Sequence, residues 1–226
     1  MEQASKAQQH SCRMKLLSAT PSPFARKARI ALHEKGLPFE LLTEVPWNND
    51  ASAPQYNPLG KIPVLMLSDG TCIYESRLIL DYLELKHPYP ALMPKEIDQL
   101  LAAKQLEALA DGACDAVVLM FIERQREPEK QSAEWEQRQA GKVKAAVEEI
   151  AHRVPHDREF TVGDHFGLGD IAVGCVLGYL DLRYPELNWR KHAHLVSLFE
   201  RLSARESFCR TVPTAQFNSA ATTSRD

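Results

Sequence analysis

A hydroxyl side chain stands where a short apolar run gives way to a helical pattern. Residues 14–17 are followed by Thr20-Pro21-Ser22-Pro23, and Pro23 suits the first position of a helix because it has a fixed φ and no N–H to lose. Ser22 is then the N-cap or its neighbour, among unpaired backbone N–H groups at the positive end of the helix dipole. This position suits phosphate binding or thiolate stabilisation. A serine that only caps the helix is the alternative.

Two predicted strands flank this helix. Residues 15–18 and 39–43 are short apolar runs, and residues 24–35 between them have the periodicity of a helix that stops at Gly36. A strand, a helix and a strand in this order form a β-α-β unit, which favours a parallel pair with a right-handed crossover. Ser22 therefore stands at the end of the first strand of a sheet.

A hairpin and a further helix follow a polar loop over residues 46–57. The apolar runs 63–67 and 71–74 are separated by a segment containing Asp-Gly, which predicts two antiparallel strands joined by a tight turn. Residues 76–85 then have helical periodicity. The order β-α-β, loop, β-β-α is that of a thioredoxin-like sheet.

Helical periodicity dominates the second half of the chain. The predicted helices cover residues 97–121, 134–154, 169–184 and 194–202. The third of them is nearly all apolar, so we expect it to be a central buried helix. The expected organisation is a disordered extension over 1–13, a thioredoxin-like domain over 14–87, a linker over 88–94, an all-α domain over 95–212 and a flexible tail over 213–226.

Composition excludes several classes of function. The net charge of −3 gives no electrostatic argument for nucleic acid or an anionic membrane as a partner. No apolar run approaches the roughly 20 residues that span a bilayer, and residues 1–13 lack the apolar core of a secretory signal. The five cysteines are widely spaced and have no metal-ligand spacing with the histidines. We expect a soluble cytoplasmic protein with reduced thiols and no metal site.

Three segments in a fixed order carry a resemblance to a known family. They are Ser22-Pro23-Phe24, the stretch Asn57-Pro58-Leu59-Gly60-Lys61-Ile62-Pro63-Val64-Leu65, and Glu75-Ser76. Together they resemble the N-terminal domain of the cytosolic glutathione S-transferases, and the helical second half is similar to that family as well. The resemblance covers roughly residues 14–212. The Ser-Pro-Phe-x-Arg-Lys form most resembles the small bacterial serine-type members.

The resemblance implies that glutathione is the co-substrate and assigns residues to its parts. Glu75 and Ser76 would hold the γ-glutamyl end, with the carboxylate at Ser76 and the ammonium at Glu75. The Ile62-Pro63 peptide bond is predicted to be cis, which would expose the backbone N–H and C=O of Ile62 to the cysteine backbone of glutathione. Ser22 would face the sulfur and favour its ionised form, with Thr20 as the nearby alternative hydroxyl.

Two further parts of the expected site stay open at this point. The glycine end of glutathione needs a donor from Trp47, Asn48, Asn49 or Lys61, and the sequence does not choose among them. The second substrate would lie between the domains, against Phe24 and the helix that carries Asp111, Asp115, Val118 and Met120. An apolar stripe of this kind is also what a helix presents to a protein core.

The implied function is a glutathione S-transferase of the detoxification type, which conjugates the thiol to a hydrophobic electrophile. The family also implies a homodimer, with the helices over 97–121 and 134–154 at the interface. The alternatives are a glutathione-dependent disulfide or peroxide reductase, which Ser22 in place of a cysteine disfavours, and a non-catalytic binding or regulatory protein.

A last motif concerns folding. Residues 160–172 resemble the family's capping motif at the central helix, where a hydroxyl residue and an acid three positions later form a capping box. Gly167 stands where the hydroxyl residue is expected, so we expect half of the box to be missing. Asp170 can still accept from backbone N–H groups, in a structural role.

Overall fold

The computed structural model describes residues 14–45, 47–48 and 51–216. The expectations for residues 1–13, Asn49 and residues 217–226 lie outside this part. The described part of the chain divides into two compact units, the first comprising its residues from 14 to 90 together with residues 214–216, and the second comprising Ala91–Pro213. Over the described residues, none of the helices combines the length and apolar character that a membrane span requires.

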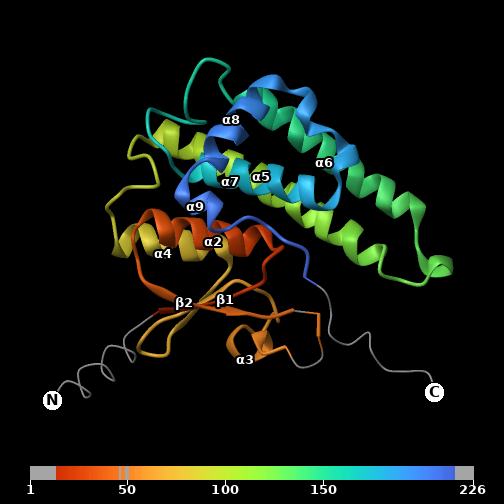
Figure 1. The fold of residues 1–226 in the computed structure, drawn as a ribbon, viewed down its shortest axis with the longest axis horizontal. Helices are drawn as coiled ribbons and strands as arrows, with labels where there is room; N and C mark the ends of the chain where they lie inside the picture. The colour runs from red at the N-terminus through yellow and green to blue at the C-terminus, as the bar shows by residue number, and fades with distance from the viewer. Residues whose placement is uncertain (1–13, 46, 49–50, 217–226) are drawn as a thin grey trace. The chain divides into compact units, whose positions relative to one another are not determined.

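The first unit is built on a mixed sheet with the strand order β2-β1-β3-β4 (Figure 1). Its strands are β1 (Met14–Ser18), β2 (Phe39–Thr43), β3 (Val64–Met66) and β4 (Cys72–Tyr74). β1 pairs with β2 in parallel and with β3 antiparallel, and β3 pairs with β4 antiparallel. The predicted β-α-β unit and hairpin are therefore confirmed.

Helices cover both faces of this sheet. α2 (Pro23–Glu34) and α4 (Ser76–Lys86) lie side by side on one face, and the short α3 (Ala53–Tyr56) lies on the other (Figure 1). Leu17 and Val64 pack there against Ala53 in a small apolar core. The sequence predicts a polar loop over 46–57, and this prediction is wrong at its end, where α3 forms.

Glu44 explains why α3 forms where the sequence predicts only loop. Its Oε1 accepts the N–H of Ala53 at 3.0 Å, and its Oε2 accepts the N–H and the hydroxyl of Ser52 at 2.8 and 2.7 Å. These bonds satisfy donors at the start of α3 that would otherwise be orphaned. The capping acid comes from eight or nine residues upstream. Ser52 stands at the N-cap of α3, but its side chain makes no capping bond, so the bonds that satisfy this helix start are not those of a local capping pattern.

A buried lysine fixes the end of α4. The side chain of Lys35 is fully buried, and its Nζ donates to the carbonyl oxygens of His87 and Pro90 at 2.7 and 2.8 Å. It also pairs with Glu84 Oε2 at 2.8 Å. A buried ammonium with three oxygen partners is compensated for the loss of water, so it anchors the segment that leaves the first unit.

The second unit is helical. Its elements are α5 (Ile97–Glu123), η1 (Pro128–Lys130), α6 (Ala133–Arg153), α7 (Leu168–Arg183), η2 (Pro185–Leu187), η3 (Trp189–Lys191), α8 (Ala193–Ser203) and α9 (Glu206–Cys209). α5 packs against both α6 and α7. All residues of α7 from Leu168 to Leu180 are buried, which confirms the predicted central helix. The sequence does not predict the one-turn helices η1, η2, η3 and α9, because elements of three or four residues are too short to show a hydrophobic period.

The start of α7 is satisfied by an acid and by a distant carbonyl. Asp170 accepts the N–H of Thr161 at 2.8 Å and that of Gly167 at 2.9 Å, so the acid half of the capping box is present. Leu168 donates its N–H to the Leu92 carbonyl at 2.8 Å. A Cβ on Gly167 would lie 2.6 Å from that carbonyl oxygen, so the glycine is required by this close approach.

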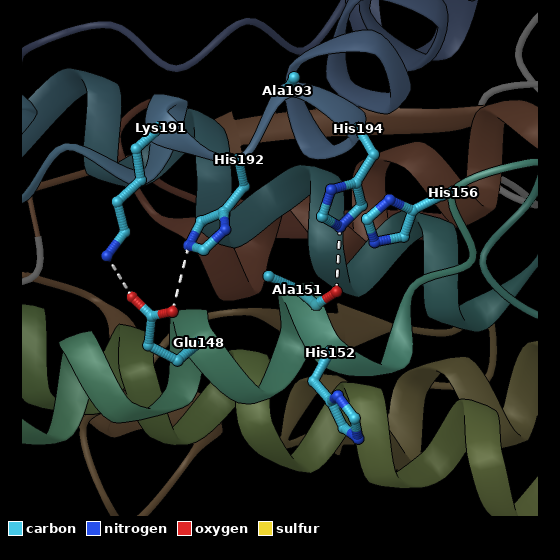
Figure 2. A pocket seen from close by; sticks show the side chains of 8 residues that line it. All are labelled: Glu148, Ala151, His152, His156, Lys191, His192, Ala193 and His194. Carbon is cyan, nitrogen blue, oxygen red and sulfur yellow. Dashed lines mark hydrogen bonds and ion pairs between the residues drawn. The ribbon is translucent and has the colours of Figure 1, made fainter.

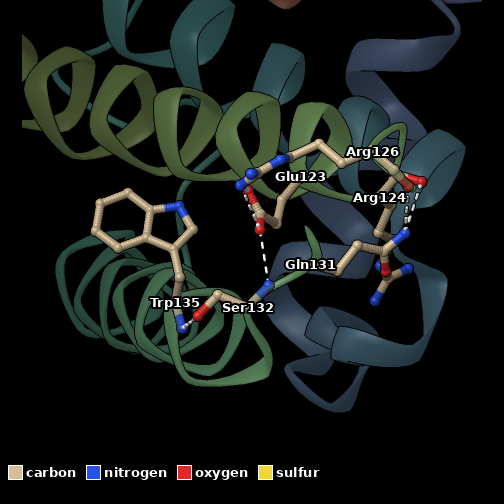
Figure 3. Close-up of polar contacts among 6 residues, drawn as sticks. All are labelled: Glu123, Arg124, Arg126, Gln131, Ser132 and Trp135. Carbon is tan, nitrogen blue, oxygen red and sulfur yellow. Dashed lines mark hydrogen bonds and ion pairs between the residues drawn. The ribbon is translucent and has the colours of Figure 1, made fainter. Parts of the chain in front are cut away.

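The turn between α5 and α6 is held by side chains on backbone groups (Figure 3). Ser132 caps α6 by accepting the N–H of Trp135 at 3.2 Å, and Glu123 accepts the N–H of Ser132 at 2.7 Å. The bond from Ser132 is the main cause that lowers the pKa of Glu123, and Arg126 at 3.2 Å acts in the same direction. Gln131 donates to the Arg126 carbonyl at 2.8 Å. The turn is thereby tied to the last residues of α5.

Candidate functional site

The predicted site residues meet at one end of the sheet of the first unit. The register pairs Leu17 with Val64 and Val64 with Tyr74, and β2 runs parallel to β1. The ends of β1, β2 and β4 and the start of β3 therefore lie at the same end of the sheet. The residues that follow or precede these strand ends are Ser22, Trp47, Lys61, Ile62, Pro63, Glu75 and Ser76.

Ser22 caps α2, as the sequence predicts. Its Oγ accepts the N–H of Ala25 at 3.2 Å, and Pro23 is the first residue of the helix. Within the described part of the chain the Ser22 hydroxyl has no acceptor for its own proton. A hydroxyl oriented by a helix N-terminus, with a proton still to donate, can stabilise an anion next to it.

The alternative hydroxyl is differently placed. Thr20 Oγ1 donates to oxygen atoms of the C-terminal segment, at Thr214 and Gln216. A hydroxyl has a single proton, so in this arrangement Thr20 has none left for a ligand. The sequence predicts residues 213–226 to be a flexible tail and gives no sign of these contacts.

The loop before β3 is shaped by a buried asparagine that the sequence argument did not single out. Asn57 Nδ2 donates to the Lys61 carbonyl at 2.8 Å, and Asn57 Oδ1 accepts the N–H of Leu59 at 2.9 Å. Gly60 has a φ of +61°, where a side chain would be strained. The Asn-Pro pair is a turn signal that could have marked this residue.

Ile62 follows this loop directly. The Ile62-Pro63 peptide bond is cis, which confirms the prediction. Neither the N–H nor the C=O of Ile62 has a backbone partner among the described residues. Both groups are therefore available to an extended peptide at this sheet end.

Glu75 holds a backbone conformation that its residue type disfavours. Its φ is +75°, and its side chain makes no capping bond to α4 although it stands at the N-cap. Such a conformation costs of order 1–3 kcal/mol in a residue with a Cβ and is found preferentially at functional sites. Within the described ranges the exposed carboxylate has no hydrogen bond or ion pair, so it can pair with a cation.

Ser76 is the first residue of α4 and is 1% exposed. In the part of the chain that the structure describes, its buried Oγ has no hydrogen-bond partner, and the same is true of Ser18 Oγ at the end of β1. A buried hydroxyl without a partner is costly. A hydroxyl at a helix N-terminus gains most from a negatively charged oxygen, so Ser76 fits a carboxylate.

The candidates for the glycine end differ in exposure. Trp47 is 52% exposed, Lys61 is exposed and Asn48 is half-buried. Lys61 accepts a hydrogen bond from the Asn57 side chain through its backbone carbonyl, so its side-chain ammonium takes no part in that bond. Asn49 lies outside the described residues.

The residues expected at the second-substrate site differ in their exposure to solvent. Met120 and Asp111 are buried at 2% and 4% exposure, whereas Asp115 is exposed and Val118 is half-buried. Met120 is part of the apolar core of its unit. Phe24 in the first unit is half-buried. Their role in binding an electrophile stays a prediction.

A hollow of about 460 Å³ in the second unit is lined by histidines and includes none of the predicted site residues (Figure 2). His156 and His194 are stacked with ring centroids 3.9 Å apart, and Glu148 pairs with Lys191 and, at 3.4 Å, with His192. Desolvation lowers the pKa of His194, although the hydrogen bond between its ring and the Ala151 carbonyl acts in the opposite direction. Among the described residues, no group of three or more His, Cys, Asp or Glu is arranged to hold a metal ion.

Comparison with known proteins agrees with the fold. The family model described as "Glutathione S-transferase, N-terminal domain" matches residues 21–86, and "Glutathione S-transferase, C-terminal domain" matches residues 133–203. The Escherichia coli (strain K12) "Uncharacterized GST-like protein YibF" is 39% identical over 201 residues, which are 88% of this chain and 98% of that relative.

Two solved structures are similar over nearly the whole chain. A glutathione S-transferase from Methylobacterium radiotolerans JCM 2831, in complex with glutathione sulfonate, is 56% identical with a TM-score of 0.89, covering 91% of this chain and 97% of that one. A glutathione S-transferase from Methylobacillus flagellatus KT, with GSH bound, is 37% identical with a TM-score of 0.84, covering 89% and 100%. A thioredoxin-like unit followed by a helical unit is the two-domain arrangement that both family models describe. The chain belongs to the glutathione S-transferase family.

Proposed function

We propose that the protein binds reduced glutathione at the end of its sheet, stabilises the thiolate and transfers it to a hydrophobic electrophile. The observation that carries this proposal is the buried Ser76 Oγ, which lacks a partner among the described residues at the N-terminus of α4. It lies at the same sheet end as the Ser22 hydroxyl. Two solved relatives contain glutathione or its sulfonate, which supports the same ligand here.

Each residue of the site has a role in this proposal. Ser76 and the first N–H groups of α4 receive the γ-glutamyl carboxylate, and Glu75 pairs with the adjacent ammonium. Ile62 offers its N–H and C=O to the cysteinyl backbone beside Pro63. Trp47 and Lys61 are the proposed donors to the glycine carboxylate.

Ser22 has the catalytic role. Bound glutathione supplies the sulfur nucleophile, and its thiol is mostly protonated at neutral pH because its pKa is near 8.5. The thiol proton goes to solvent, and the Ser22 hydroxyl donates a hydrogen bond to the sulfur, which favours the thiolate. A carbon–sulfur bond then forms at the electrophile, and the leaving group departs with its bonding electrons.

Binding and turnover with two substrate classes separate this proposal from its alternatives. We expect retention on immobilised glutathione and conjugation of a chlorodinitrobenzene by the purified protein. Turnover of a mixed disulfide without conjugation would favour a glutathione-dependent reductase, which can use bound glutathione for exchange without a protein thiol. Retention with neither activity would support a non-catalytic binding protein.

Glu75 provides a test in which effects on glutathione binding can be separated from effects on stability. Glu75→Gly removes the carboxylate and also the strain that a Cβ causes at a φ of +75°. Glu75→Ala removes the carboxylate but keeps the Cβ and therefore the strain. Both variants should bind glutathione about tenfold more weakly, as expected for a lost charge-assisted bond, with a smaller loss of turnover at saturation. Glu75→Gly should unfold with a free energy up to about 1 kcal/mol higher than Glu75→Ala.

Calorimetric titration with glutathione and denaturant unfolding measure the two effects. Glu127→Ala is a matched control, because Glu127 is an exposed acid of the second unit whose described partner is Lys130. Unchanged glutathione affinity in both Glu75 variants would remove Glu75 from the site.

We also propose that the protein acts as a homodimer in detoxification. The support is membership of the family together with exposed apolar side chains on α5 and α6. These include Leu101, Leu119, Ile122 and Trp135. Large apolar side chains exposed on two helices that pack together are typical of a surface that is covered in the assembled protein.

A further inference from the structure

The turn that carries Ser22 is held by the other end of the chain. Gln216 Oε1 accepts the N–H of Thr20 at 3.2 Å and the Thr20 hydroxyl at 3.4 Å. The Thr214 carbonyl accepts the same hydroxyl at 3.2 Å. These contacts join residues 194 to 196 positions apart, and both partners belong to the first compact unit.

The other polar groups of this turn are engaged locally. The N–H of Ser22 donates to the Ala19 carbonyl at 3.2 Å and closes the turn, and Arg29 donates to the Thr20 carbonyl at 3.3 Å. Thr20 is therefore fixed through its N–H, its C=O and its hydroxyl. Arg29 of α2 holds the C=O of Thr20, whereas the C-terminal segment holds its N–H and its hydroxyl.

Movement of Thr20 would change the position of the Ser22 hydroxyl. The two residues share one closed turn, so rotation of the Thr20 peptide groups is transmitted to the backbone that carries Ser22. A hydrogen bond to a sulfur anion depends on placement within about half an ångström. The tail contacts also occupy the Thr20 proton, so they leave Ser22 as the hydroxyl with a proton to donate.

We infer that Gln216 is a positioning residue for the reaction, which acts through Thr20 to hold the Ser22 hydroxyl against the thiol. The inference rests on the proposed function, since it assigns Gln216 a role in that same site. It makes the C-terminal segment part of the active-site turn. No local sequence pattern indicates this, because the contact joins the two ends of the chain.

The test compares Gln216→Ala and Thr20→Val with Ser22→Ala in the full chain. Removing one neutral hydrogen-bond partner should lower kcat/KM for conjugation about three- to tenfold and raise the pKa of the bound glutathione thiol by about 0.5–1 unit. Ultraviolet absorbance of the thiolate, titrated with pH, measures that pKa. Hydrogen exchange of the peptide containing Thr20 should be faster in Gln216→Ala.

Two further variants complete the design. Gln137→Ala makes the same chemical change at an exposed position of α6 and should leave the thiol pKa unchanged. In the double variant Gln216→Ala/Ser22→Ala the pKa should be that of Ser22→Ala alone, because a positioning residue has no effect once the group it positions is gone.

The outcomes are distinguishable. A raised thiol pKa in Ser22→Ala with no change in Gln216→Ala would overturn the inference and leave the proposed function standing. Additive effects in the double variant would show that Gln216 acts independently of Ser22, which also overturns it. A thiol pKa that is lower in Gln216→Ala would mean that the Thr20 hydroxyl, without its bond to Gln216, serves the sulfur, which overturns the inference as well. An unchanged pKa in Ser22→Ala would overturn the catalytic assignment itself, and the inference with it.

Discussion

Replacing Ser22 by alanine is expected to raise the pKa of the glutathione thiol bound to the protein by about one to two units. A hydrogen bond to a charged group contributes about 1.5–3 kcal/mol, and each pKa unit corresponds to about 1.4 kcal/mol. Conjugation at neutral pH should then fall about ten- to a hundredfold, because less of the thiol is ionised. Affinity for glutathione should change little, since the other contacts remain.

The same substitution removes a helix cap, which needs its own control. Ser22 Oγ accepts the Ala25 N–H at 3.2 Å, and its loss should lower the free energy of unfolding by about 0.5–2 kcal/mol. Ser132 caps α6 with the same distance to the Trp135 N–H, in the second unit. Ser132→Ala should therefore reproduce the loss of stability without changing the thiol pKa. Ser22→Thr keeps a hydroxyl and should restore both properties in part.

An ultraviolet titration of the bound thiolate decides between the two roles of Ser22. A thiol pKa that is the same in Ser22→Ala and in the unsubstituted protein would reduce Ser22 to a helix cap. Thr20 or the backbone N–H groups of α2 would then be the groups that stabilise the anion.

The sheet of the first unit could be predicted because its signals are local. The helix start at Pro23, its stop at Gly36 and the Asp-Gly turn each fix a boundary within a few residues. Given those boundaries, the β-α-β rule predicts the parallel pair β1–β2, and the hairpin rule predicts the antiparallel pair β3–β4. The antiparallel pairing of β1 with β3, which joins the two pairs, follows from neither rule and is predicted only by the thioredoxin-like order of the elements. The positions of the site residues follow from the strand ends.

The parts that could not be predicted depend on contacts between distant residues. Glu44 caps α3 from eight or nine positions upstream, and Leu92 approaches Gly167 too closely for any side chain there. Gln216 reaches Thr20 across nearly the whole chain. From the sequence alone, Gly167 is explained only as a position where the hydroxyl half of a capping box is missing. Its reason is steric, and it becomes visible only when the Leu92 carbonyl is in place.

Replacing Asp170 by alanine is expected to lower the free energy of unfolding by about 2–5 kcal/mol at pH 7.5. Asp170 is 1% exposed and accepts two backbone N–H groups, those of Thr161 and Gly167, at 2.8 and 2.9 Å. Alanine would leave both donors buried without a partner, and each such group costs about 1–3 kcal/mol. Denaturant unfolding followed by circular dichroism measures the change. Asp164→Ala, an exposed acid in the same loop, should leave stability within about 0.5 kcal/mol of the unsubstituted protein.

The pH dependence of this difference tests the electrostatics of the buried acid. Desolvation raises the pKa of Asp170 to about 6 from its ordinary value of 3.8, against the two backbone hydrogen bonds. Because the folded pKa is the higher one, the native state binds the proton more tightly than the unfolded chain does. Its contribution to stability is fully present below about pH 4 and is lost as pH rises through about 6.

The stability lost in Asp170→Ala should therefore be larger at pH 5 than at pH 7.5, by about 1.4 kcal/mol for a folded pKa of about 6. Only the difference between the two proteins isolates Asp170, because other groups titrate in the same range. A loss that is smaller at pH 5 would mean that the two N–H donors outweigh desolvation and hold the folded pKa below 3.8. Asp170 would then stabilise α7 as a carboxylate, and its contribution would grow, rather than shrink, as pH rises from 4 toward neutrality.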